Sequence, residues 1–487
     1  MNAPTFVAPA KGVFINNRWR PGASGKTITV VAPADGRAFA SITAGNAADI
    51  DAAVKAARSA VEGGSWSKLS ATERGRLLSK LAIAVADHAE ELALLEARDT
   101  GKPLKQARND MIALSRYFEY YGGAADKVHG ETIPFLPGYF VTTERVPYGV
   151  TAHIIPWNYP AQMFGRTVAP ALAMGNACVV KPAEDACLTP LLIAELAAGV
   201  GFPEGAINLV PGSGEEAGAA LSSHPDIDFV SFTGSPEVGT LIQTAAARNH
   251  IGCTLELGGK SPHVVFGDAD LDTAATTIAI TMVQNAGQTC SAGSRVLVEK
   301  AAYDKVVTAL ADRFSKLVAG TPEMDRDCGP VINATQKTRI EGFFARAEAA
   351  GVPVIAKGQI AAGVPTGGFF VAPRVFGPVP RANELATKEV FGPVLSVLPF
   401  EDESDAVRLA NGTDYGLMAA VWSRDANRAV RVSRGIKAGQ VYINAFGAGG
   451  GIELPFGGMK KSGHGREKGF AALHDASQLR TTIIKHG

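Results

Sequence analysis

Apolar residues recur at every third or fourth position between residues 50 and 127, which is the spacing of an amphipathic helix. The clearest stretch is ATERGRLLSKLAIAVADHAEELALLEARDTG, and it stops at Gly101, a residue type that favours the end of a helix. We expect this segment to form a helical outer layer of the protein.

The chain then changes to an alternation of strand-like and helix-like segments. GYFVTTERVPYG, at 138–149, alternates apolar and polar residues like a strand or a hairpin. Four short apolar runs follow about 25 residues apart: VTAHIIP, ACVVKP, AINLVP and DFVSFTG. The helical patterns after them are the residues beyond Pro160, TPLLIAELAAG, EEAGAALSS and SPEVGTLIQTAAA. This order predicts a parallel sheet with helices on its faces.

A second series of the same kind begins after Glu256. It comprises the strand SRVLVEK, the helix YDKVVTALADRFSKLVAG at 303–320, the strand PVLSVLPF, the helix ESDAVRLANG and the strand QVYIN. We therefore expect a second α/β domain and an active site between the two. Ligands of such sheets bind beyond the carboxyl ends of the strands. The residues at those ends in the first series are Asn158, Lys181, Glu184, Gly214 and Gly234.

Composition narrows the class of protein. The chain has 487 residues, 46% hydrophobic and 19% charged, which predicts a globular protein of two or three units. Lys+Arg and Asp+Glu both total 47, so no basic excess points to nucleic acid or to an anionic membrane. Five scattered cysteines without a CxxC pair argue against a zinc site, and no export signal or membrane span is evident. We expect a cytoplasmic enzyme for small molecules, without a metal.

Three residues are candidates for nucleophilic chemistry. Cys290 lies in NAGQTCSAG, a turn-prone setting where backbone N–H groups can face a thiolate. Glu256, in LELGGKSP, ends a strand beside two glycines and could accept a proton or activate water. Asn158 lies between two prolines in PWNYP, which could hold its amide as an oxyanion donor. Taken singly, they also read as a buried small side chain, a surface carboxylate and a turn residue.

Three segments are candidates for binding a dinucleotide. PGSGEEAG matches the G-x-G-x-x-A pattern after a strand, and FTGSPEVG also runs from strand to glycine to helix, where phosphate is attracted. Both also read as ordinary tight turns. VVKPAE places Lys181 and Glu184 just past a strand, where a ribose could bond to them. A carboxylate there repels a 2′-phosphate, so the sequence favours NAD over NADP.

The motifs PWNYP, VVKPAE, FTGSPEVG, LELGGKSP, GQTC, EVFGPV, NGTDYGL and PFGGMKKSGHGRE occur in that order over nearly the whole chain. In this combination the sequence resembles the aldehyde dehydrogenase superfamily. The resemblance implies an α/β fold with two Rossmann-type parallel-sheet domains and a small β-hairpin oligomerisation element, in a homodimer or homotetramer. The implied divisions are 1–125 with 148–258 for NAD binding, 259–469 for catalysis, and 126–147 with 470–487 for oligomerisation.

The resemblance also implies catalytic roles. Cys290 is the nucleophile, Glu256 the general base, Asn158 with the Cys290 N–H the oxyanion hole, and Glu467 a proton relay. The thiolate would attack the aldehyde, hydride would leave for NAD, and water activated by Glu256 would hydrolyse the thioester. Family members that use coenzyme A as acceptor usually lack a glutamate at position 256, so its presence favours hydrolysis.

For the cofactor, the resemblance implies a set of residues spread over several motifs. Lys181 and Glu184 would bind the adenosine ribose, and Gly214 and Gly218 would border the adenine pocket. The others are Phe232, Ser235 and Val238 at the adenine side and pyrophosphate, Glu389 and Phe391 at the nicotinamide ribose, and Ile154, Trp157 and Leu257 in the same cleft.

The substrate tunnel is expected to include Tyr159, Met163, Arg166, Gln284, Ser291 and the loop at 445–454. Many relatives that act on aliphatic aldehydes or betaine aldehyde have an aromatic residue where this chain has Arg166. A buried arginine needs an acceptor, which could be a substrate anion or an internal salt bridge. We hypothesise a substrate that bears a carboxylate, as in succinic semialdehyde, or an aromatic ring. The alternatives are a catalytically silent protein of this fold and a cysteine esterase.

Overall fold

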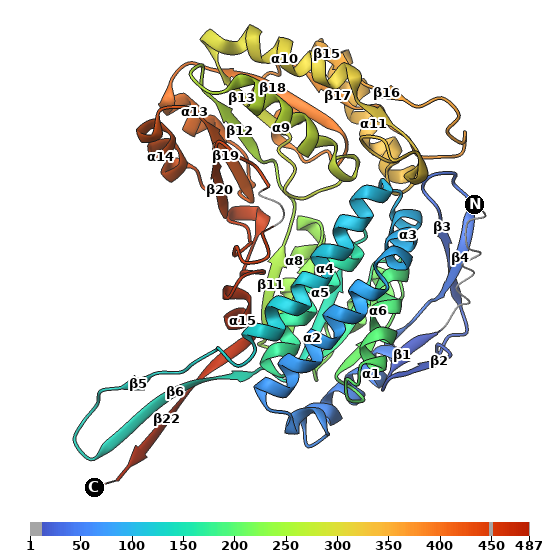
Figure 1. The fold of residues 1–487 in the computed structure, drawn as a ribbon, viewed down its shortest axis with the longest axis vertical. Helices are drawn as coiled ribbons and strands as arrows, with labels where there is room; N and C mark the ends of the chain where they lie inside the picture. Colours follow the sequence, from blue (N-terminus) through green and yellow to red (C-terminus); the bar gives the residue numbers. More distant parts are fainter. Residues whose placement is uncertain (1–11, 448–450, 487) are drawn as a thin grey trace.

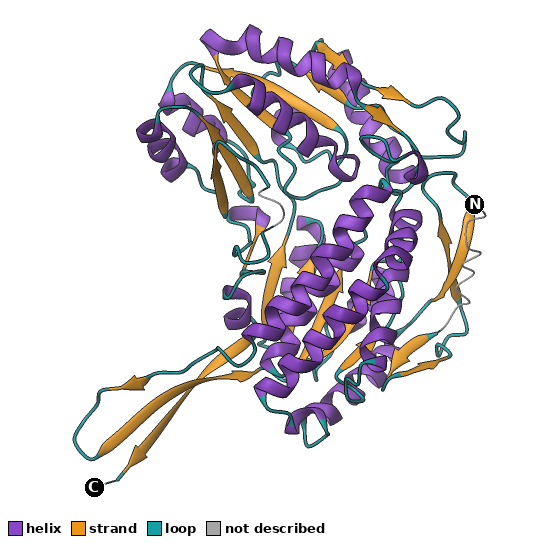
Figure 2. Cartoon of the chain, viewed as in Figure 1, coloured by secondary structure: helices purple, strands orange, loops and turns teal. Residues whose placement is uncertain are grey.

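The structure is a computed structural model that describes residues 12–447 and 451–486. Two α/β halves face each other, and a three-stranded sheet projects from one of them (Figures 1 and 2). Each half has a hydrophobic core of its own, one around each large sheet. The predicted fold class is confirmed: an α/β protein with two mainly parallel sheets.

The predicted helical layer is formed by four helices. They are α1 (Ala47–Val61), α2 (Ala71–Asp87), α3 (Ala89–Thr100) and α4 (Leu104–Ala124), with a short 3-10 turn at Trp66–Lys68. Gly101 caps α3 in the left-handed conformation, with φ 81°, as the sequence predicts. Helix α4 packs on α2 outside and on α5 (Pro160–Met174) inside, so α2 and α4 cover the sheet from one side (Figure 1). Two N-terminal hairpins precede them: β1 (Val13–Ile15) with β2 (Arg18–Arg20), and β3 (Thr27–Val31) with β4 (Ala38–Thr43).

The first large sheet has the order β2-β1-β9-β8-β7-β10-β11-β21. Its central strands are parallel: β7 (Val150–Ile155), β8 (Ala177–Pro182), β9 (Ile207–Leu209), β10 (Phe229–Thr233) and β11 (Gly252–Glu256). The crossover helices are α5, α6 (Leu188–Gly199), α7 (Ala219–Ser222) and α8 (Pro236–Arg248). β21 (Gly463–His464) pairs antiparallel with β11, so part of the segment 259–469 returns to this sheet.

The second large sheet has the order β15-β17-β18-β13-β12-β19-β20. Its strands are β12 (Pro262–Val265), β13 (Arg295–Glu299), β15 (Val354–Lys357), β17 (Arg374–Phe376), β18 (Val394–Phe400), β19 (Met418–Trp422) and β20 (Gln440–Ile443). All pairs are parallel except β15 with β17. The helices around it are α9 (Leu271–Val283), α10 (Tyr303–Lys316), α11 (Ala334–Ala349), α12 (Glu384–Thr387), α13 (Glu403–Ala410) and α14 (Ala426–Gly435).

Two predicted helices differ from the structure. The helix expected at 303–320 ends at Lys316, and β14 (Val318–Ala319) follows, paired with β16 (Gln359–Ile360). The apolar periodicity continues to Val318, but the main chain there is extended and pairs with β16. The helix expected from EEAGAALSS begins as a π-turn at Gly214–Gly218 and becomes the single α-turn of α7.

The projecting sheet contains β5 (Thr132–Ile133), β6 (Tyr139–Pro147) and β22 (Ser477–Lys485). β22 pairs with β6 along its whole length, after the short helix α15 (Ala471–Asp475). These strands lie within the segments 126–147 and 470–487 expected for the oligomerisation element, of which Gly487 is outside the described residues. In the described part of the chain, no helix is long and apolar enough to cross a membrane.

Candidate active site

The carboxyl ends of five neighbouring parallel strands bring the predicted residues together. In the order β9-β8-β7-β10-β11, the residues that follow or end these strands come from PGSG, KPAE, PWN, TGS and LELGG. These motifs lie up to about 100 residues apart in the sequence, but the sheet brings them to one edge. This edge faces the second half of the molecule (Figure 1).

A cavity of 310 Å³ lies at this edge and is lined from both halves of the chain. From the predicted set it is lined by Trp157, Asn158, Ser235, Glu256, Cys290, Glu389 and Phe391. The three candidates for nucleophilic chemistry thus share one cavity with four candidates for cofactor binding. None of them could be assigned singly, and their convergence is what makes the chemistry specific.

Cys290 lies on a tightly constrained loop. Asn285 and Ala286 have positive φ values of 47° and 54°, and Gly287 has φ 73°. Gly259, after β11, packs against this loop so closely that a Cβ atom there would lie 2.3 Å from the Cys290 carbonyl oxygen. Only glycine fits at 259, so the backbone after the base strand can lie against the nucleophile. The Cys290 side chain is half-buried and free of any disulfide.

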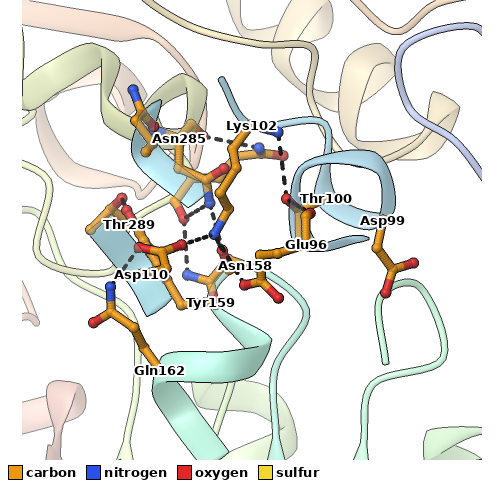
Figure 3. A network of polar contacts seen from close by, with 12 residues as sticks. Glu96, Asp99, Thr100, Lys102, Asp110, Asn158, Tyr159, Gln162, Asn285 and Thr289 are labelled. Carbon is orange, nitrogen blue, oxygen red and sulfur yellow. Dashed lines mark hydrogen bonds and ion pairs between the residues drawn. The ribbon is translucent and has the colours of Figure 1, made fainter. Parts of the chain in front are cut away.

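The Asn158 side chain is anchored by one hydrogen bond. Its Nδ2 donates to the Gln288 carbonyl at 2.9 Å, which leaves its second amide hydrogen for another acceptor. Figure 3 shows that the main-chain carbonyl of Asn158 accepts hydrogen bonds from two donors, Lys102 Nζ and Asn285 Nδ2. Asn158 is 4% exposed, and its amide is held in a fixed direction.

Glu256 is a buried carboxylate, 1% exposed, and neither of its oxygens has a hydrogen-bond partner. Burial, and then the neighbouring Glu467, raise its pKa well above the usual value, against the opposing effect of Arg166. Burial likewise raises the pKa of Cys290 to about 12. The thiol therefore needs a proton acceptor, and a carboxylate of raised pKa is a stronger base than an ordinary one.

Arg166 on α5 is an internal ion-pair partner. It pairs with Glu467, its Nη2 lies 3.6 Å from Glu256 Oε2, and its guanidinium stacks on Phe456 at 4.2 Å. Its side chain is only 4% exposed. Of the two alternatives that the sequence leaves open, this geometry is that of the internal salt bridge. Arg166 thus links Glu467 to Glu256.

The second group of cofactor candidates forms a polar corner beyond β8 and β9. Lys181 Nζ lies 3.0 Å from Glu184 Oε2, and the Gly214 N–H donates to Glu184 Oε1 at 3.2 Å. A Cβ atom at Gly218 would lie 3.5 Å from the Lys181 side chain. The glycines of PGSGEEAG thus border this corner, and the Glu184 carboxylate is the group that would face a ribose.

The site fits a dinucleotide on three observations. Helix α8 opens at the cavity with its first N–H groups and positive dipole end, capped by Ser235, whose Oγ accepts from Val238 N–H. Thr233 Oγ1 is buried there without a partner. The Glu389 carboxylate is fixed by the Gly259 N–H at 2.8 Å. These groups suit a diphosphate and ribose hydroxyls.

Of the remaining cofactor candidates, only Trp157 and Phe391 line the 310 Å³ cavity, and the others lie on or next to β7, β10, β11 and α8. Trp157 and Phe391 meet edge to face, with ring centroids 5.5 Å apart. Phe232 lies under Gly234, and Leu257 lies under Gly239 of α8, so both support the start of that helix. Ile154, 8% exposed, is on the β7 strand, and Val238 is 42% exposed on α8.

One further cavity is lined by part of the expected substrate tunnel. A second cavity, of 680 Å³, is lined by Gln284, Phe446, Gly447, Gly451 and Ile452, together with polar residues of α4. Among the described residues, Tyr159, Met163, Arg166 and Ser291 do not line it. Tyr159 instead bonds Thr289 Oγ1 at 2.8 Å, and Met163 is 5% exposed. Residues 448–450 of the expected loop lie outside the described residues.

Several residues at the site were not identified from the sequence. Gln336 and Arg339 on α11 bind the carbonyls of the EVF segment, and Lys102, Asn285 and Gln288 surround Asn158. Lys102 follows Gly101, and Asn285 and Gln288 lie within three residues of Gly287. The sequence pattern around them does not predict a contact with Asn158. Within residues 12–447 and 451–486, no cluster of His, Cys, Asp and Glu could hold a metal ion.

Comparisons with known proteins agree with this geometry. The sequence model of the aldehyde dehydrogenase family matches residues 19–482. Human retinal dehydrogenase 2 is 43% identical over 477 residues, 97% of this chain and 91% of that protein. A crystal structure from Burkholderia cenocepacia, described as a candidate aldehyde dehydrogenase, has TM-score 0.97 and 57% identity, covering 98% of this chain and all of that one. Betaine aldehyde dehydrogenase from Staphylococcus aureus, solved with NAD⁺, has TM-score 0.95 and 37% identity, covering 99% and 95%.

Proposed function

Because the chain belongs to the aldehyde dehydrogenase family, we propose that it oxidises an aldehyde to the carboxylic acid by covalent catalysis at Cys290, with NAD as the hydride acceptor. The observation that carries the proposal is the shared cavity, in which Cys290, Glu256 and Asn158 meet beside the start of α8. Of the predicted site residues, these three perform the chemistry on the substrate carbon.

Acylation uses the thiol and the amide. Cys290 Sγ, after its proton passes to Glu256, which later releases it, bonds to the carbonyl carbon, and the carbonyl oxygen becomes an oxyanion. The free amide hydrogen of Asn158 stabilises that charge because it is already oriented by the bond to Gln288. A bound NAD would supply the acceptor for the hydride that the carbon must lose before the adduct on Cys290 becomes a thioester.

Deacylation uses the base. Glu256 removes a proton from water, the resulting hydroxide equivalent adds to the thioester carbon, and the carbon–sulfur bond breaks to release the acid. Arg166, which pairs with Glu467 and lies 3.6 Å from Glu256 Oε2, gives this base a charged neighbour. This neighbourhood supports the proposal that Glu467 takes up the proton that Glu256 has received.

The preference for NAD over NADP rests on Glu184. Its carboxylate is oriented by Lys181 and by the Gly214 N–H, and a 2′-phosphate beside it would meet a like charge. We expect Glu184→Ser to raise the ratio of kcat/KM with NADP to that with NAD by at least about tenfold, the equivalent of about 1.4 kcal/mol. Glu215→Gln, an exposed carboxylate in the next turn, is the matched control. Equal kcat/KM with both cofactors in the wild type would contradict the role of Glu184.

The substrate is proposed to be an aldehyde with an aromatic ring or a carboxylate, and the salt bridge favours the aromatic class. Arg166 already has Glu467 and Glu256 as partners, so a substrate carboxylate would have to displace one of them. The test is NADH formation with benzaldehyde-type aldehydes, succinic semialdehyde and hexanal. Equal kcat/KM with hexanal would argue against both proposed classes, and no NADH with any aldehyde would revive the silent-protein alternative.

The role of Arg166 has its own prediction. In Arg166→Met the charge that lowers the pKa of Glu256 is lost, while Glu467, Arg466 and Lys468 remain. The acid limb of the kcat–pH profile should therefore move to higher pH. The ratio of kcat/KM for succinic semialdehyde to that for benzaldehyde should stay within about twofold of the wild-type ratio, because an Arg166 paired internally does not bind the substrate carboxylate. Arg76→Met, exposed on α2, is the control. A selective loss of the semialdehyde would instead assign Arg166 to substrate binding.

We further propose a homodimer or homotetramer that forms through the projecting sheet. Leu479, Ile483 and Ile484 on β22 are 59%, 61% and 49% exposed, and an exposed apolar edge strand favours pairing with a second chain. A cytoplasmic location is proposed because all five cysteines are free thiols.

A further inference from the structure

A buried cation lies directly behind the Asn158 segment. Lys102, between α3 and α4, has a fully buried side chain. Its Nζ pairs with Asp110 on α4 and lies 3.4 Å from Glu96 Oε1 on α3 (Figure 3). A buried ammonium is costly unless every donor has a partner, so its position is fixed by the acceptors around it.

The third acceptor of this ammonium belongs to the active site. Lys102 Nζ donates to the Asn158 carbonyl at 3.1 Å, and it lies 4.4 Å from the centre of the Tyr159 ring. The helical layer therefore reaches the segment that carries the oxyanion donor through one side chain (Figure 3).

The same segment is held from the other side by the Cys290 loop. Asn285 Nδ2 donates to the Asn158 carbonyl at 2.7 Å, and Asn158 Nδ2 donates to the Gln288 carbonyl at 2.9 Å. Tyr159 Oη bonds Thr289 Oγ1 at 2.8 Å. The main chain at Asn158 is thus fixed between Lys102 and the loop of the nucleophile.

From this geometry we infer that Lys102 is a positioning residue of the reaction, which fixes the main chain at Asn158 and so aims the Asn158 amide at the developing oxyanion. The inference rests on the proposed function. Lys102 is not a catalytic residue, because it acts on the substrate only through Asn158. Nothing in the roles already given to Cys290, Glu256 and Glu467 requires a cation at this place.

The size of the effect follows from the nature of an oxyanion hole. A donor contributes to the rate only if it is already aimed at the charge that develops, and removing one donor costs about 10²–10³-fold. A displacement of about 1 Å can cost about 10²-fold. Loss of Lys102 leaves the Asn158 carbonyl with Asn285 as its remaining side-chain donor, so we expect a loss of about 10–100-fold in acylation.

The test is a double-mutant cycle on the pre-steady-state burst of NADH. Lys102→Met should slow the burst by about 10–100-fold, and Asn158→Ala by about 10²–10³-fold. If Lys102 acts through Asn158, adding Lys102→Met to Asn158→Ala should slow the burst by no more than about twofold further. Lys105→Met, an exposed lysine in the first turn of α4, should leave the burst unchanged.

A second measurement separates positioning from general damage. Alkylation of Cys290 by iodoacetamide develops no oxyanion, so its rate in Lys102→Met should stay within about twofold of the wild type, as should the Kd for NAD. A merely structural loss would slow alkylation and weaken NAD binding together with the burst.

A double variant keeps the test valid if Lys102→Met alone does not fold. Removing one partner of a buried ion pair costs about 3–5 kcal/mol, so Lys102→Met alone risks unfolding. Lys102→Met with Asp110→Asn leaves no charge from the closer pair. Burial raises the pKa of Glu96 above its usual value, and without the opposing Lys102 charge this carboxyl group favours its protonated, neutral form. This double variant enters the cycle if the single one does not fold, with Asp110→Asn alone as its reference.

The outcomes are distinct. Losses that multiply in the combined variant, an unchanged burst in a folded Lys102 variant, or an equal loss in alkylation would each overturn the inference. Failure of the proposed function would appear in the wild type as no burst of NADH. In that case hydrolysis of p-nitrophenyl acetate, which needs the thiol and the oxyanion hole but no NAD, carries the same cycle.

Discussion

Cys290→Ala is expected to abolish NADH formation, with a loss of at least about 10⁴-fold in kcat. The reason is chemical: without Sγ no covalent adduct forms, so the carbon that must release hydride never reaches the alkoxide state from which hydride leaves. The loss should be the same for every aldehyde, because the missing bond is common to all of them. Initial rates of NADH formation at saturating aldehyde and NAD measure it.

The control for this variant is Cys253→Ala. Cys253 lies on β11, the strand that ends at Glu256, but it does not line the cavity. Cys253→Ala should keep kcat within about twofold of the wild type, since replacing a half-buried side chain outside the cavity by alanine costs little. Cys290→Ala should still be stabilised by NAD against thermal unfolding, which shows that the site is intact. NADH formation by Cys290→Ala above the background without enzyme would contradict the assignment of the nucleophile.

The sequence was a good guide where periodicity and sheet topology decide the outcome. Apolar runs separated by helical patterns require parallel pairing, and parallel pairing collects the carboxyl ends of strands at one edge. Asn158 and Gly234 were therefore predicted at the same edge of the sheet, and both line the 310 Å³ cavity. The same reasoning failed at Val318, because helical periodicity does not reveal that a distant strand will take the backbone.

The contacts behind the site could not be predicted from the sequence. Arg166, Glu467 and Lys102 act through side chains that meet across separate elements, and no local pattern encodes which buried charges will pair. The resemblance identified Arg166 as unusual, but the choice between a substrate anion and an internal partner depends on three-dimensional distances. For the expected substrate tunnel, the sequence does not reveal which cavity each residue borders: Gln284 lines the larger cavity, whereas Tyr159 and Met163 are buried and do not line it.

Glu256→Gln is expected to separate the two halves of the reaction. Glutamine keeps the shape of the side chain but accepts no proton, so the thioester should form and then persist. Because burial raises the pKa of Cys290 to about 12, only a small fraction of the thiol has lost its proton to solvent at a pH of about 9, and the loss of the Glu256 charge, which raises this pKa, increases that fraction. We expect a slower burst that still reaches about one NADH per site, followed by a steady-state rate lower by about 10²–10⁴-fold.

The pH dependence gives the same variant a second readout. Burial raises the pKa of Glu256 well above its usual value, so in the wild type the base is protonated and inactive at low pH, and the steady-state rate should rise as pH increases through that raised pKa. In Glu256→Gln this limb should disappear from the deacylation step, because the titrating group is gone. Stopped-flow burst amplitudes and the mass of the protein after the burst, increased by the acyl group, would measure both effects. If the burst were lost along with the steady-state rate at pH 9, Glu256 would be required for acylation, and the water-activating role alone would not describe it.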